Sequence, residues 1–132
     1  MPARYKDWLR QAKRDLAHAQ RALDNGDYEW ACFATQQSAE KAVKALFFKA
    51  NANAWGHSVA ALLQELPTPW RADDSLINAG KELDKHYIPP RYPNSYPQGA
   101  PYEYYTREET ERAIAHTADI LAFCERLLAE SK

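Results

Sequence analysis

The sequence predicts an all-α protein, an up-and-down helical bundle of four to five helices with a long proline- and tyrosine-rich loop before the last helix. Apolar side chains recur at steps of three and four residues in several windows, which is the periodicity of one helix face. No window shows the period-two alternation of a strand. At 132 residues the chain has the length of one domain, so we expect a single helical domain over residues 1–132.

The first half predicts two long antiparallel helices. Apolar positions recur from Tyr5 to Leu23, and Asn25-Gly26 is typical of a helix end because both residues accept the left-handed conformation. Asp27 can then act as the N-cap of a second helix that runs to about Lys49. Apolar positions cover well over half the circumference of this second helix. We therefore expect it to be central, covered by several neighbours or by a second subunit.

Two shorter helices are expected next. His57-Ser58 precedes an apolar run that Pro67 and Pro69 end, because a proline disfavours helical geometry in the residue before it. Residues 72–85 can form a further helix, which Gly80 weakens.

Residues 86–105 differ in composition from the rest of the chain. This segment holds five of the eight prolines and six of the eight tyrosines, which predicts an ordered loop anchored by aromatic rings. Thr106 and Glu109 have the spacing of a capping box, so the last helix is expected to begin there and to close the bundle.

Composition and charge exclude several classes of protein. The net charge is -1, without the basic surplus of a general nucleic-acid binder, and we expect no DNA partner. Residues 1–50 nevertheless carry nine Lys/Arg against six Asp/Glu, and the remainder eight against twelve, so one face can be basic. No apolar run is long enough to span a membrane. With two cysteines and no export signal, the expected location is cytoplasmic, with reduced thiols.

The common catalytic and cofactor motifs are missing. No two histidines have the i, i+3 or i, i+4 spacing of metal ligands, and the two cysteines form no CxxC pair. There is no phosphate-binding glycine motif and no serine in the context of a nucleophile. We therefore expect no metal, no cofactor and no catalytic residues, and the thiols are interpreted as core residues.

The polar residues that remain suit an anionic ligand. The polar arc of the second long helix carries Gln37, Glu40, Lys41 and Lys44. The candidate ligand-binding residues are Lys41, Lys44, His57, Arg91 and Tyr92, because lysine and arginine bind phosphate and tyrosine can stack on a base.

Each candidate also has a structural alternative. The two lysines can be a solvated helix edge, the His57 ring can cap a backbone carbonyl, and Arg91 can pin loop carbonyls. His18 and His116 border apolar stripes and are expected to be partly buried packing residues.

Five stretches carry a family resemblance: residues 8–16 (WLRQAKRDL), 25–28 (NGDY), 32–46 (CFATQQSAEKAVKAL), 56–58 (GHS) and 91–93 (RYP). Together they resemble the HEPN domain family. The resemblance implies a helical bundle that commonly dimerises and is encoded beside, or fused to, a minimal nucleotidyltransferase, with nucleotide binding or a toxin–antitoxin role in some members. Other members are metal-independent ribonucleases with an Arg, four to six residues, then His. Here Arg112 and His116 have three intervening residues, and Arg107 and His116 have eight.

Three functions are compatible with this sequence. The leading hypothesis is a noncatalytic HEPN homodimer that binds a nucleotide or another phosphate-bearing ligand and serves as the partner of a nucleotidyltransferase in a toxin–antitoxin-like pair. The enzyme alternative is a metal-independent ribonuclease toxin with His57 or His116 as base. The third is a structural interaction module that docks through its tyrosine loop.

Overall fold

The computed structural model describes residues 3–131, which form five α-helices, two short 3-10 helices and no strand. The elements are α1 (Arg4–Asn25), α2 (Tyr28–Lys49), α3 (Val59–Gln64), α4 (Asp74–Asp84), η1 (Pro93–Ser95), η2 (Pro101–Glu103) and α5 (Arg107–Glu130). The all-helical fold expected from the sequence is confirmed. None of the described helices is long and apolar enough to cross a membrane.

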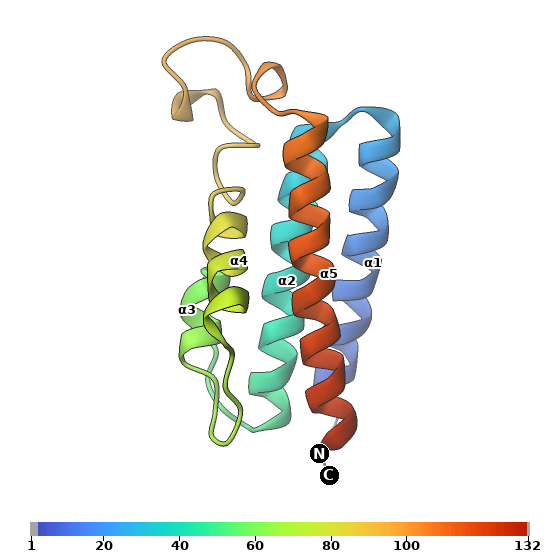
Figure 1. The fold of residues 1–132 in the computed structure, drawn as a ribbon, viewed down its shortest axis with the longest axis vertical. Coiled ribbons are helices and arrows are strands. Elements are labelled where there is room, and N and C mark those ends of the chain that lie inside the picture. Colours follow the sequence, from blue (N-terminus) through green and yellow to red (C-terminus); the bar gives the residue numbers. More distant parts are fainter. Residues whose placement is uncertain (1–2, 132) are drawn as a thin grey trace.

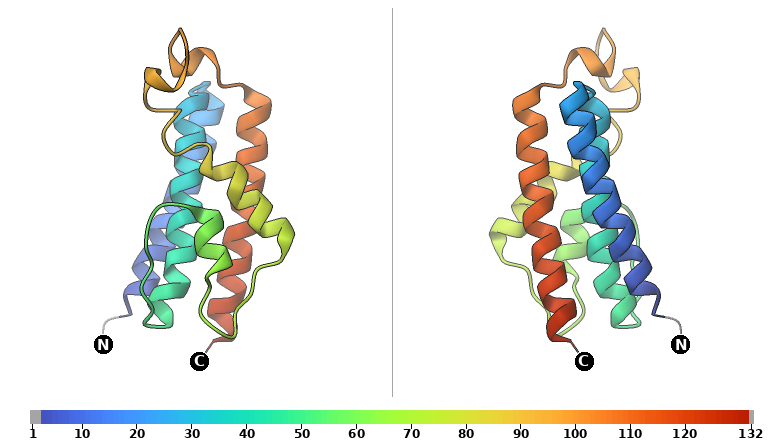
Figure 2. Two further views of the ribbon diagram at one scale, coloured as in Figure 1. Left: turned by 90° about the vertical axis from the view of Figure 1, so that its left-hand side faces the viewer. Right: turned by 90° about the vertical axis from the view of Figure 1, so that its right-hand side faces the viewer.

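The helices form an up-and-down bundle (Figure 1). The long helices α1, α2 and α5 run side by side, and α3 and α4 together take the place of a fourth helix (Figure 2). Both chain ends lie at one end of the bundle, and the loop between α4 and α5 lies at the opposite end (Figure 1).

The turn between α1 and α2 follows the expected chemistry except for one cap. Gly26 has φ 81° and a left-handed conformation, and the Asp27 amide donates to the Ala22 carbonyl at 2.8 Å. This six-to-one bond is typical of a glycine-terminated helix. Asp27 occupies the N-cap position of α2, but its side chain makes no capping hydrogen bond. The expected position is therefore confirmed, and the expected side-chain bond is not present.

Helix α2 is the central element and is covered by its own chain. It packs against α1, α3, α4 and α5. The Ser38 hydroxyl donates to the Ala12 carbonyl of α1 at 2.6 Å, and the Thr117 hydroxyl of α5 donates to the Thr35 carbonyl at 3.1 Å. These bonds satisfy polar groups that would be costly to bury unpaired. Because neighbouring helices cover α2, its apolar excess does not itself require a second subunit.

Helices α3 and α4 approach each other closely. The Asp84 carboxylate accepts hydrogen bonds from the Ser58 hydroxyl at 2.7 Å and from the Val59 amide at 2.6 Å, at the start of α3. A Cβ atom at Gly80 would lie 3.0 Å from the backbone nitrogen of Ala60. The expectation that Gly80 merely weakens α4 is therefore incomplete, because the missing side chain is what allows the two helices to pack.

The loop before α5 is ordered by its aromatic residues. The rings of Tyr96 and Tyr104 are stacked, with centroids 4.1 Å apart. Tyr105 is buried, and its hydroxyl lies 3.4 Å from Nδ1 of His86. The Thr106 hydroxyl accepts from the Glu109 amide at 3.1 Å, which is one half of the expected capping box at the start of α5. The return bond from the Thr106 amide to the Glu109 carboxylate is not found among residues 3–131.

The imidazole of His86 makes stability depend on pH. The residue is 7% exposed, and burial lowers the pKa of His86 to about 4. A histidine in the unfolded chain has a pKa near 6.5. Below that pH the unfolded state takes up a proton that the folded state does not bind, so stability falls progressively between pH of roughly 6.5 and 4.

Over this pH range we expect the unfolding free energy of the wild type to fall by about 3 kcal/mol more than that of the variant His86→Gln. Urea unfolding at several pH values from 7 to 4.5 measures the difference. His18, which the structure places on the surface of α1 rather than partly buried, supplies the control His18→Gln. Parallel stability curves for the wild type and His86→Gln would contradict the assignment.

Candidate functional site

Four of the five candidate residues lie in one connected row of contacts. Lys44 comes from α2, His57 from the connection between α2 and α3, and Arg91 and Tyr92 from the segment after α4. We call this row, together with Phe33, Glu40 and Tyr87, the aromatic–cation cluster. These segments are far apart in the sequence, and the topology of the bundle brings them together.

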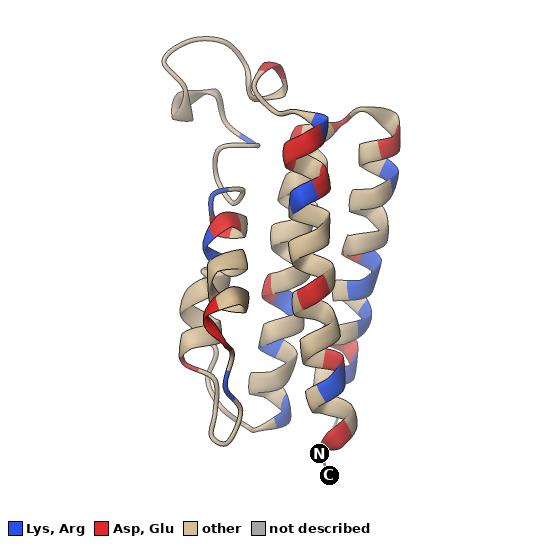
Figure 3. Cartoon of the chain, viewed as in Figure 1, with Lys and Arg blue, Asp and Glu red and all other residues tan. Residues whose placement is uncertain are grey.

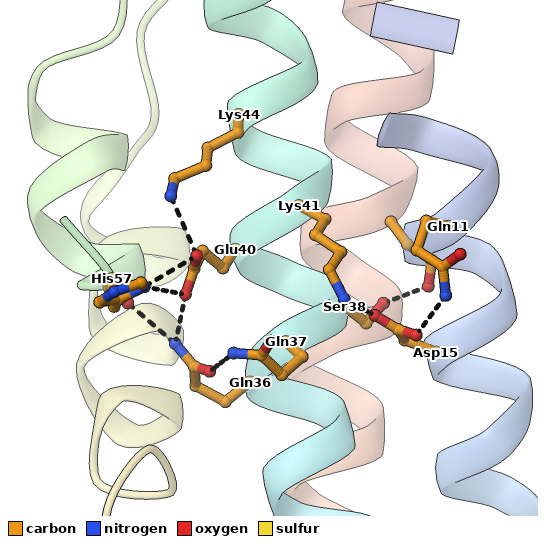
Figure 4. A network of polar contacts seen from close by, with 10 residues as sticks. Gln11, Asp15, Gln36, Gln37, Ser38, Glu40, Lys41, Lys44 and His57 are labelled. Atoms are coloured by element: carbon orange, nitrogen blue, oxygen red, sulfur yellow. Dashed lines mark hydrogen bonds and ion pairs between the residues drawn. The ribbon is translucent and has the colours of Figure 1, made fainter. Parts of the chain in front are cut away.

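A buried carboxylate organises the ionic end of the cluster. Glu40 is 5% exposed, and it accepts hydrogen bonds from Lys44 Nζ at 3.0 Å and from His57 Nδ1 at 3.1 Å. The Gln36 amide donates to Glu40 at 3.2 Å and to the His57 carbonyl at 2.8 Å (Figure 4). Because a carboxylate only accepts, Nδ1 of His57 carries the proton and Nε2 is left for other partners.

The position of His57 corrects one structural alternative. Its ring does not cap a carbonyl but binds Glu40 and stacks on Tyr87, with ring centroids 4.7 Å apart and planes 18° apart. Glu40 is a member of the cluster that the sequence analysis did not propose, because it was assigned to a polar arc of α2. Its spacing of four residues before Lys44 was the available signal.

Aromatic rings surround the guanidinium of Arg91 at the other end of the cluster. Its Cζ atom lies 4.4 Å from the ring centroid of Phe33, 4.7 Å from that of Tyr87 and 5.3 Å from that of Tyr92. Its Nε donates to the Tyr87 carbonyl at 2.8 Å. Arg91 is therefore a structural pin, as one alternative expected, and within residues 3–131 its two terminal nitrogens make no side-chain hydrogen bond or ion pair.

The cluster presents both rings and charge to solvent. Tyr92 is 49% exposed and Trp30, which makes an edge contact with Phe33, is 50% exposed. The His57 side chain is 55% exposed. Within residues 3–131, no carboxylate lies within ion-pair distance of Arg91. A planar ring can stack here while an anionic group meets the guanidinium.

Lys41 does not belong to this cluster. It points toward α1, where its Nζ lies 2.5 Å from a carboxylate oxygen of Asp15, and Gln11 also donates to that carboxylate at 2.8 Å. Figure 4 shows Lys41 and Lys44 diverging on the two sides of α2. The charge of Lys41 is therefore offset by Asp15, away from His57 and Arg91.

The two cysteine side chains lie in the core. Cys32 and Cys124 are buried free thiols, and burial raises the pKa of Cys32 to about 12 and that of Cys124 further. Both thiols therefore stay protonated and unreactive. The described part of the chain holds no group of three His, Cys, Asp or Glu residues that could bind a metal. Both acidic and basic residues lie along α5, with acidic residues in the majority (Figure 3).

Comparison with known proteins identifies the family. The HEPN domain profile matches residues 5–127. A Methanocaldococcus jannaschii protein named "Putative toxin MJ1304" is 28% identical, covering 95% of this chain and 88% of that protein.

Solved structures agree in fold. The protein TT1696 from Thermus thermophilus has a TM-score of 0.92 and 48% identity, covering 95% of this chain and 98% of that one. The archaeal HEPN homologue ST0689 has a TM-score of 0.80 and 41% identity, covering 96% and 98%. An HEPN domain protein from Thermotoga maritima has a TM-score of 0.78 and 41% identity, covering 95% and 99%. The chain belongs to the HEPN domain family.

Proposed function

We propose that this HEPN protein binds a nucleotide at the aromatic–cation cluster and has no catalytic activity of its own. The observation that carries the proposal is the environment of the Arg91 guanidinium. Three rings hold its guanidinium in place, it lacks an acidic partner among the described residues, and half-exposed Tyr92 lies beside it. A nucleotide combines the two groups that this arrangement accepts, a stacking base and a phosphate.

The charge balance of the cluster favours one orientation of the ligand. Glu40 offsets the charge of Lys44, so Arg91 supplies positive charge that no carboxylate of the cluster offsets. We place the base against Tyr92 and Trp30 and a phosphate on the terminal nitrogens of Arg91. His57 Nε2 and Lys44 then contact more distant polar groups of the ligand.

We further propose that the protein acts as a homodimer and as the partner of a minimal nucleotidyltransferase in a toxin–antitoxin-like pair. The relative named as a toxin supports a role of this kind. The nucleotidyltransferase partner is proposed because the family resemblance implies one encoded beside, or fused to, the HEPN domain.

Calorimetric titration with ATP and GTP tests nucleotide binding. We expect Arg91→Ala to weaken binding about 10-fold or more, because a hydrogen bond to a charged group contributes roughly 1.5–3 kcal/mol. Tyr92→Ala should also weaken binding, and its exposed ring makes it a variant with little effect on folding. Lys41→Ala is the matched control and should bind as the wild type does. Absence of heat with the wild type, or equal binding by Arg91→Ala, would refute the proposal.

Co-expression with a minimal nucleotidyltransferase, taken from the neighbouring gene if that gene encodes one, tests the partnership. We expect the two proteins to co-purify, and the chain alone to scatter light as a particle of twice its 15.1 kDa. A particle of 15.1 kDa at micromolar concentration would argue against the homodimer, and separate elution would argue against the partner.

Ribonuclease activity is the second candidate, favoured by the relative named as a toxin. We expect none, because the Arg112 to His116 spacing departs from that of ribonuclease members and His116 is engaged by Glu82. Incubation of metal-free protein with tRNA, beside His57→Ala and His116→Ala, tests this expectation. Cleavage that either substitution abolishes would replace the noncatalytic assignment.

A further inference from the structure

A second polar site lies between the end of α4 and the first turns of α5. It is a pocket of about 130 Å³, and its polar lining comes from Glu82, Lys85, His86, Glu109, Arg112 and His116. His86 and Tyr87 are adjacent in the sequence, but their side chains contact different groups. His86 lines the pocket and contacts Tyr105, whereas Tyr87 contacts Phe33 and His57 of the aromatic–cation cluster. The pocket and the nucleotide site proposed above therefore share no residue.

Two cations at this pocket lack a partner. Neither Lys85 nor Arg112 forms an ion pair with any residue in the described range 3–131. Lys41 and Lys44, in contrast, are each held by a carboxylate. The charges of Lys85 and Arg112 both act on His86, whose pKa they lower in addition to the larger effect of burial. An anion placed between them would gain from both.

The two imidazoles supply further polar atoms. His86 uses Nδ1 for the contact with the Tyr105 hydroxyl, which leaves Nε2 as its second polar atom. His116 Nε2 contacts a carboxylate oxygen of Glu82, so this carboxylate already has a partner. Glu109 is then the second carboxylate in the pocket lining, beside the unpaired cations Lys85 and Arg112.

Glu109 sets the kind of anion that fits. A carboxylate repels a fully deprotonated oxyanion, but it accepts a hydrogen bond from an oxyanion that still carries a proton. Near neutral pH, phosphomonoesters, whose second pKa is about 6, carry such a proton in part, and the more basic inorganic phosphate carries it to a greater extent, whereas sulfate carries none. The pocket has room for a tetrahedral group.

We propose that this pocket binds one phosphate group, either as free inorganic phosphate or as the terminal group of a phosphomonoester. Arg112 provides two donors to the phosphate oxygens and Lys85 a point charge. Glu109 accepts a hydrogen bond from the protonated phosphate oxygen, and this contact distinguishes phosphate from sulfate.

Histidine ring NMR at pH 6.5 tests the proposal, with inorganic phosphate, ribose 5-phosphate and sulfate titrated at equal ionic strength. We expect phosphate to shift the His86 and His116 resonances saturably, with sulfate about 10-fold weaker or more, the discrimination that roughly 1.4 kcal/mol supplies. Tighter binding of ribose 5-phosphate than of inorganic phosphate would identify the ester as the ligand, and the reverse would identify the free ion. Absence of a saturable shift with either phosphate would overturn the proposal.

Variants assign the residues. Arg112→Ala should weaken phosphate binding about 10-fold or more. The matched control Arg107→Ala removes an exposed arginine of the same helix that pairs with Glu111 instead, and it should bind normally. Glu109→Gln should bring phosphate and sulfate affinities together. Arg91→Ala should leave the shifts intact, which separates this pocket from the nucleotide site. Equal affinities for phosphate and sulfate in the wild type, or normal binding by Arg112→Ala, would refute the assignment.

Discussion

The buried carboxylate of Glu40 is the contact on which the arrangement of this surface depends. A charge this far from water is tolerated only with partners, and removing one member of a buried pair typically costs about 3–5 kcal/mol. Glu40 finds its partners in Lys44, His57 and Gln36, which come from α2 and from the connection to α3. Satisfying one carboxylate therefore fixes the backbone that follows α2. It also orients the imidazole that faces solvent.

Arg91 has a comparable double role after α4. Its Nε bond to the Tyr87 carbonyl and its contacts with three rings hold the side chain in one conformation before any ligand arrives. An arginine that is already ordered loses less side-chain entropy on binding than a free one. The residue is thus a structural contact and a preorganised donor at once, and the two interpretations of it are not exclusive.

Local rules accounted for most of the fold, and contacts distant in sequence accounted for most of what was missed. Apolar periodicity, the Asn25-Gly26 end and the Thr106 cap depend on neighbouring residues, and the structure has them as expected. Glu40 and Lys41 lie one residue apart, on the same polar arc. Their contacts differ because of tertiary packing: α1 brings Asp15 to Lys41, and the segment before α3 brings His57 to Glu40. No single-helix pattern contains that information.

The close approach at Gly80 reaches beyond the two helices that it joins. Helix α3 rests against this position through Ala60, and Ser58 and Val59 are tied to the end of α4 by Asp84. The imidazole of His57 immediately precedes this anchored segment. A single methyl group in the interior, introduced 23 positions further along the chain, would therefore displace the solvent-exposed ring of His57 without touching it. A substitution at position 80 would therefore alter the exposed surface at His57 as well as the packing of the interior.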